Sequence, residues 1–102
     1  MPERTEKRRW PRLPLAADVE FRRKRETHYT IPIHDLTPHG CRLASPESLL
    51  LNEMVWVQLP SLASLSAHVK WTESWQSGVE FERPMHPAVF NMMMGRLAPA
   101  ND

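Results

Sequence analysis

The sequence predicts an all-β domain that ends in one helix. Its 102 residues are enough for one domain with a single core. Short segments with alternating apolar and polar residues follow one another between residues 15 and 81, as in strands with one buried face. The spacing leaves no room for helical crossovers, so antiparallel strands in a barrel or a compact sandwich are favoured over a parallel sheet.

The first segment shows the alternation clearly, since Val19 and Phe21 alternate with Asp18 and Glu20. The six expected strands cover residues 15–22, 29–34, 41–43, 54–59, 65–71 and 78–81. In the fifth strand, apolar residues occur at positions 65, 67, 69 and 71, which predicts that all four share one face. Turn-forming stretches at residues 45–48 and 60–61 separate neighbouring strands.

A helical pattern follows the strands over residues 86–97. Phe90, Met93, Met94 and Leu97 are spaced so that they share one helix face, and Pro87 suits the first turn. Because apolar stripes are usually core, we expect this helix to cover one open end of a barrel. A Met-rich surface that binds a partner is the alternative.

Composition excludes several classes of protein. A hydrophobic content of 41% and a charged content of 25% are typical of a globular chain. Cys41 is the only cysteine, which excludes an intrachain disulfide and a cysteine-based metal centre. The longest uncharged run, residues 54–69, contains polar residues and a proline that a bilayer does not accept. We therefore expect a cytoplasmic protein without direct membrane insertion.

Enzyme motifs are absent from the sequence. It has no nucleophile elbow, no Gly-rich phosphate loop and no His-Glu-x-x-His pattern, and its five histidines lack metal-ligand spacing. We expect no catalytic activity, no metal site and no cofactor.

Basic residues are concentrated near the start of the chain. Residues 1–25 contain nine of the 13 Lys and Arg against four acids, whereas acids outnumber bases in the remainder. The stretch "KRRWPR" at residues 7–12 is compatible with a solvated tail, a nucleic-acid arm or half of a ligand site. Duplex binders spread charge over a whole face, so an anionic small ligand is favoured over DNA or RNA. The charge run that contains Arg23 is assigned to solvent.

A second informative stretch, "DLTPHG", occupies residues 35–40. Its residue types predict a hairpin turn in which Asp35 caps its own backbone, Pro38 fixes one dihedral and Gly40 takes the left-handed conformation.

Together, the two stretches resemble the PilZ domain family. Arg8 and Arg12 fit its Arg-x-x-x-Arg motif, and residues 35–40 fit its Asp/Asn-x-Ser-x-x-Gly motif, with Thr37 where the family prefers Ser. The resemblance runs from residue 6 to about residue 97 and includes "VKW" at 69–71 and "GVEF" at 78–81. It implies a six-stranded antiparallel PilZ-type β-barrel with a C-terminal helix over one end. It also implies binding of the bacterial second messenger cyclic di-GMP.

The resemblance also implies which residues bind the ligand. An arginine guanidinium matches the O6 and N7 acceptors of guanine, and an Asp can accept hydrogen bonds from the guanine N1 and N2 edge. Trp71 aligns with an aromatic residue that contacts the ligand in some relatives, and packing on the barrel is its alternative role. The expected ligand-binding residues are Arg8, Arg9, Arg12, Asp35, Thr37, Gly40 and Trp71.

These observations predict a stand-alone PilZ-type receptor. We expect residues 1–12 to be a flexible ligand-binding segment, residues 13–97 to be the barrel with its helix, and residues 98–102 to be a tail. Ligand binding is expected to order the N-terminal segment and to create a surface for an effector protein. A PilZ-like adaptor that no longer binds cyclic di-GMP is the alternative. A basic-arm nucleic-acid binder is disfavoured by the acidic remainder of the chain.

Overall fold

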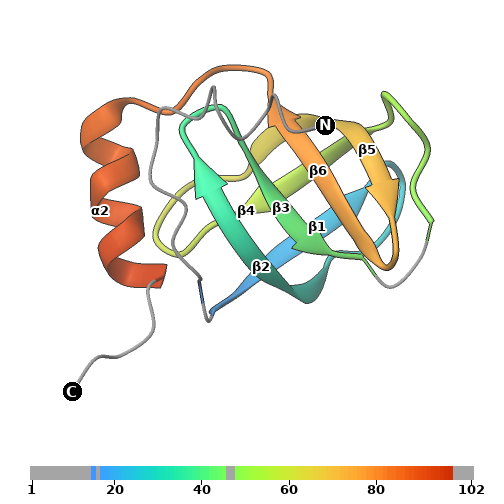
Figure 1. The fold of residues 1–102 in the computed structure, drawn as a ribbon, viewed down its shortest axis with the longest axis horizontal. Coiled ribbons are helices and arrows are strands. Elements are labelled where there is room, and N and C mark those ends of the chain that lie inside the picture. Colours follow the sequence, from blue (N-terminus) through green and yellow to red (C-terminus); the bar gives the residue numbers. More distant parts are fainter. Residues whose placement is uncertain (1–14, 16, 46–47, 98–102) are drawn as a thin grey trace.

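The computed structural model describes residues 15, 17–45 and 48–97. In this part of the chain, six antiparallel strands close into a barrel and a helix follows them (Figure 1). The elements are β1 (Ala17–Arg23), β2 (Tyr29–Thr37), β3 (Gly40–Ala44), β4 (Met54–Gln58), β5 (Leu65–Glu73), β6 (Gln76–Phe81) and α2 (Pro87–Leu97). Around the barrel the order is β1-β2-β3-β6-β5-β4, and β4 pairs with β1. The predicted barrel with a C-terminal helix is therefore confirmed, and the compact sandwich is wrong.

Alternation along the strands fills the barrel. Val19 and Phe21 on β1 are buried, whereas Asp18 and Glu20 between them are exposed. Inward-facing residues of all six strands form one cluster. Its strand members include Val19, Phe21, Ile31, Ile33, Leu36, Cys41, Leu43, Val55, Val57, Ala67, Val69, Val79 and Phe81.

The helix α2 covers one end of the barrel (Figure 1). Phe90, Met93 and Leu97 are buried in the same cluster as the barrel core, and Met94 packs against it. The packing role predicted for this apolar stripe is therefore confirmed. Arg96 also fastens the helix, because its Nη1 donates a hydrogen bond to the Ser61 hydroxyl at 2.7 Å.

The stretch at residues 35–40 is not the six-residue turn that its composition predicts. Asp35 and Thr37 belong to β2, Gly40 begins β3, and Thr37 pairs with Gly40 in register. The loop therefore consists only of Pro38 and His39. No described glycine has a positive φ, so the predicted left-handed Gly40 is also wrong. Leu36 is buried opposite Cys41, and this apolar pairing extends the ladder beyond the predicted strand end.

Two β-bulges interrupt the alternation on the strands that carry site residues. The register of β2 with β3 shifts between Ile33 and Asp35, and that of β5 with β6 shifts between Val69 and Trp71. A bulge places an extra residue in one strand and re-aims the side chains beyond it. Trp71 consequently does not share the inward face of Val69, which corrects the uniform alternation predicted for β5.

Arg23 is not exposed to solvent, although the charge run that contains it predicts exposure. Its side chain is only 18% exposed and pairs with Glu53, Nη2 lying 2.9 Å from Oε1. The predicted segments at residues 1–12 and 98–102 lie outside the described residues.

Candidate ligand-binding site

Four residues on four adjacent strands lie in one row across the outer face of the barrel. Asp35 on β2 pairs with Arg42 on β3, Arg42 pairs with Gly78 on β6, and Gly78 pairs with Trp71 on β5. Directly opposed residues in an antiparallel sheet point to the same face. The row lies outside because the residues next to Asp35, Arg42 and Gly78 on the same strands are buried in the core, namely Leu36, Cys41 and Val79. Trp71 lies on the same face because it pairs with Gly78 beyond the bulge in β5. We call these four residues the outer row.

Asp35 is held by an arginine from the neighbouring strand. Nε of Arg42 donates to Oδ2 of Asp35 at 3.0 Å, and Nη2 lies 3.0 Å from the same oxygen. Nη1 of Arg42 donates to Oε1 of Gln76 at 2.7 Å. Asp35 is 6% exposed and the Arg42 side chain is 33% exposed. A nearly buried carboxylate is stabilised by such charge-assisted bonds, so the Asp35 side chain has a defined position.

Thr37 uses its hydroxyl within the hairpin. Its Oγ1 accepts a hydrogen bond from the His39 amide at 3.1 Å and donates to the Gly40 carbonyl at 3.4 Å. The hairpin is itself tied down, because the carbonyl of Pro38 accepts from the Met85 amide at 2.7 Å. The residue at the family's Ser position therefore stabilises the turn beside Asp35.

Gly40 is needed for close approach of two backbones. A Cβ at this position would lie 2.1 Å from the carbonyl oxygen of Val79 on β6. Since Gly40 pairs with Glu80 across that ladder, the strands could not keep this separation with any larger residue. This is a packing reason for the motif glycine, and it differs from the turn conformation predicted for it.

Trp71 packs on the barrel at the far end of the outer row. Its side chain lies against Gly78, where a Cβ would be 2.2 Å from Nε1 of the indole. Trp71 is half-buried, and its partner Gly78 pairs with Arg42 on the other side. The packing role is thus present, and contact of this ring with a ligand stays a prediction.

The thiol beneath the outer row offers no chemistry. Burial, with a smaller contribution from the Asp35 carboxylate, raises the pKa of Cys41 far above its ordinary value. The thiol is therefore protonated and unsuited to nucleophilic attack. Within the described ranges, no group of three or more His, Cys, Asp or Glu side chains could hold a metal ion.

The adjacent strands β2, β3, β6 and β5 bring four of the predicted ligand-binding residues onto one region of the barrel. These are Asp35, Thr37, Gly40 and Trp71. Arg8, Arg9 and Arg12 lie outside the described residues. Sequence reasoning missed Arg42 and Gln76. The only feature of the sequence that could have indicated Arg42 was its position on the strand after the hairpin. No local feature indicated Gln76, because its partner Arg42 is 34 residues away in the sequence.

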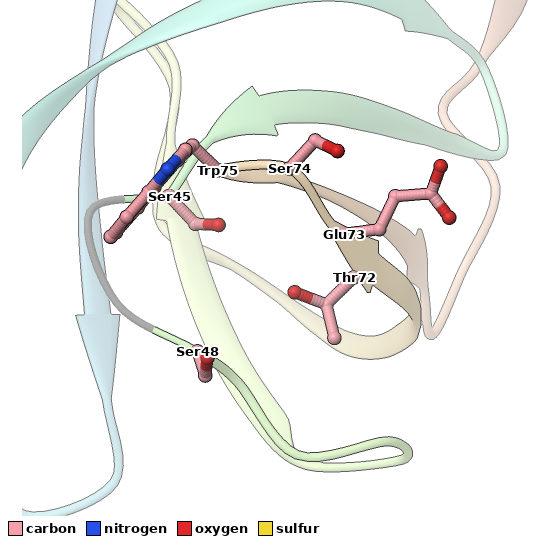
Figure 2. A pocket seen from close by; sticks show the side chains of 6 residues that line it. All are labelled: Ser45, Ser48, Thr72, Glu73, Ser74 and Trp75. Atoms are coloured by element: carbon pink, nitrogen blue, oxygen red, sulfur yellow. The ribbon is translucent and has the colours of Figure 1, made fainter.

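A separate hollow of about 200 Å³ opens where β3 and the β5–β6 turn end (Figure 2). Ser74 and Trp75 form that turn with φ values of 52° and 64°, and Trp75 is 72% exposed. The predicted ligand-binding residues do not line this hollow, so it is distinct from the outer row. Its lining residues are Ser45, Ser48, Thr72, Glu73, Ser74 and Trp75.

In the part of the chain that the structure covers, the only helix is 11 residues long, and no helix could cross a membrane.

Comparison with curated proteins finds no match. The family model described as PilZ domain matches residues 6–93, which includes both motifs and all six strands. Together with the closed six-stranded barrel, this match shows that the chain belongs to the PilZ domain family.

Proposed function

We propose that this protein is a receptor that binds cyclic di-GMP on the outer row. PilZ domains form a family of cyclic di-GMP receptors and are not enzymes. The observation that carries the proposal is the outer row itself, which places a carboxylate and an aromatic ring on one face of the barrel. A carboxylate suits recognition of the guanine edge, and an aromatic ring suits stacking on the purine face.

Each chemical part of the ligand has a counterpart in this proposal. Asp35 accepts hydrogen bonds from the N1 and N2 groups of one guanine, and the accessible part of Trp71 contacts a purine face. Arg8, Arg9 and Arg12 supply guanidinium groups for the phosphates and for guanine O6 and N7. Neither half of the site is sufficient alone, which explains why the basic stretch and the β2–β3 hairpin occur together.

The signal leaves through the N-terminal segment in this proposal. Residues 1–12 contain many charges and, apart from Met1, only one large apolar side chain, that of Trp10. Their ordering therefore depends on the ligand. Closure of this segment over the ligand creates a new surface, and a cytoplasmic effector protein reads that surface. In this proposal the partner is a protein rather than DNA or RNA.

One specific observation favours the alternative, an adaptor that no longer binds cyclic di-GMP. Asp35 is already paired with Arg42, and the hydroxyl of Thr37 is already engaged in the hairpin. A ligand must bind beside these contacts or replace them. In an adaptor, the same contacts would serve only to hold the barrel surface for a protein partner.

Calorimetric titration of the full chain separates the two functions. We expect cyclic di-GMP to bind with a dissociation constant in the micromolar range or below, and GMP and cyclic AMP to bind far more weakly. The single nucleotides cannot engage both halves of the site. Absence of heat and of any tryptophan fluorescence change at about 100 μM cyclic di-GMP would overturn the receptor and leave the adaptor, because a micromolar site would be saturated at that concentration.

A further inference from the structure

We propose that Arg42 is a positioning residue that gives this receptor its selectivity for guanine, with Gln76 as its support. The inference rests on the proposed function and extends it to two residues that lie outside the family motifs quoted above. It starts from the contacts of Arg42, which link three strands of the outer face: β2 through Asp35, its own strand β3, and β6 through Gln76.

Asp35 can read guanine only if its carboxylate plane is fixed. The N1 and N2 groups of guanine donate side by side, so an acceptor in the wrong rotation loses one of the two bonds. In the structure, two nitrogens of Arg42 meet the same carboxylate oxygen, each at 3.0 Å. Asp35 is also nearly buried, and a buried carboxylate needs charge-assisted hydrogen bonds to keep its position. Arg42 therefore supplies both the charge balance and the orientation.

Arg42 is in turn fixed at its other end. Gln76 accepts from Nη1 at 2.7 Å, so all three guanidinium nitrogens of Arg42 are engaged. Arginine suits this task because its planar guanidinium presents its donors in a fixed geometry, whereas lysine presents a single point charge. Gly78, which pairs with Arg42, has no side chain to displace it, and the Trp71 indole occupies the place that a Cβ of residue 78 would take.

The test compares two ligands that differ only in the exocyclic N2 amino group of their bases. Both bases of cyclic di-IMP lack this group, so whichever base Asp35 contacts, one of the two bonds to Asp35 is lost. We expect the wild-type chain to bind cyclic di-GMP at least about tenfold more tightly than cyclic di-IMP, the loss expected for a bond to a charged group. The ratio of the two dissociation constants, measured by calorimetry, is the readout.

Arg42→Met keeps the side-chain volume and removes the guanidinium. We expect the ratio to fall to about threefold or less, and Arg42→Lys to restore only part of it. Gln76→Ala leaves the pair with Asp35 in place and should lower the ratio to an intermediate value, which keeps the test valid if Arg42→Met does not fold. Lys24→Ala, an exposed cation between β1 and β2, is the matched control and should keep the wild-type ratio.

Two failures have different meanings. If wild-type protein binds neither cyclic dinucleotide, the proposed function itself is overturned. If it binds cyclic di-GMP selectively and folded Arg42→Met keeps the wild-type ratio, the receptor stands and the role of Arg42 is overturned. A merely structural role would lower the unfolding temperature and weaken both ligands equally, leaving the ratio unchanged, and this result also overturns the proposal.

Discussion

The indole of Trp71 on β5 lies directly against Gly78 on β6, so that a Cβ at position 78 would be 2.2 Å from Nε1 and 2.5 Å from Cε2 of the ring. This contact joins two neighbouring strands on the outer face, and Gly78 pairs with Arg42 on β3 on its other side. Position 78 therefore controls where the ring lies.

Gly78→Ala should displace the Trp71 ring and destabilise the fold by about 1–3 kcal/mol, the usual cost of inserting a methyl group into an occupied space. Gly95→Ala is the matched control, since no atom lies within 4 Å of the added Cβ. In the helix α2 this control should be stabilising by about 1 kcal/mol. Urea unfolding of both variants checks the pair, and equal stability changes would contradict the contact.

The basic stretch can be tested by removing single charges. Arg8→Ala and Arg12→Ala should each weaken cyclic di-GMP binding by about 2 kcal/mol, the range for charge-assisted contacts, with little change in thermal stability. Arg23 is unsuitable as the control because it pairs with Glu53. Lys24→Ala replaces it, and an equal loss of affinity in Lys24→Ala would indicate a diffuse electrostatic arm rather than a defined motif.

The Arg23–Glu53 pair predicts a pH dependence of stability. Burial acts to raise the pKa of Glu53, but hydrogen bonds from Arg23 and from the Leu50 amide, with the Arg23 charge, outweigh it and lower the pKa from its ordinary value of 4.5. A lowered pKa in the folded state means that the stabilisation is complete above pH 4.5 and is lost as the pH falls through the folded-state value.

Glu53→Gln should therefore be less stable than wild type at pH 7, by about 1.5 kcal/mol for bonds to a charged group. The difference should shrink progressively below pH 4.5. Chemical unfolding at pH 7, 5 and 3 checks this, and a constant difference across the series would show that the charge of Glu53 is not the cause.

Hydrogen exchange tests the proposed signal route. Cyclic di-GMP should increase the protection of residues 4–13, with little change between residues 54 and 81. The increase in protection at residues 35–40 should be smaller than an unpaired turn would show, because these residues already belong to the hydrogen-bonded β2–β3 hairpin. If residues 4–13 are already protected without ligand, the signal leaves by another route, and the helix α2 becomes the next segment to test.

Local patterns were sufficient to identify the strands and the helix, but they left a barrel and a compact sandwich open. Alternation at residues such as Val19 and Phe21 identified the strands, and the spacing of Phe90, Met93 and Leu97 identified the helix and its buried face. These features depend on side chains that are neighbours along one element, so they can be recognised without knowing what the element packs against. The two motif stretches likewise identified the family, because motif spacing is a property of the chain itself.

The faces of Asp35 and Trp71 were decided by the tertiary structure. Continued alternation would have placed each on the inward face of its strand, and one extra residue in β2 and in β5 turns them outward. A register shift reverses every side chain beyond it, and the shift depends on the partner strand rather than on local sequence. The same dependence explains Arg42: its contacts with Asp35 and with Gln76, 34 residues away, exist only once the β2–β3 hairpin has formed and β3 has paired with β6.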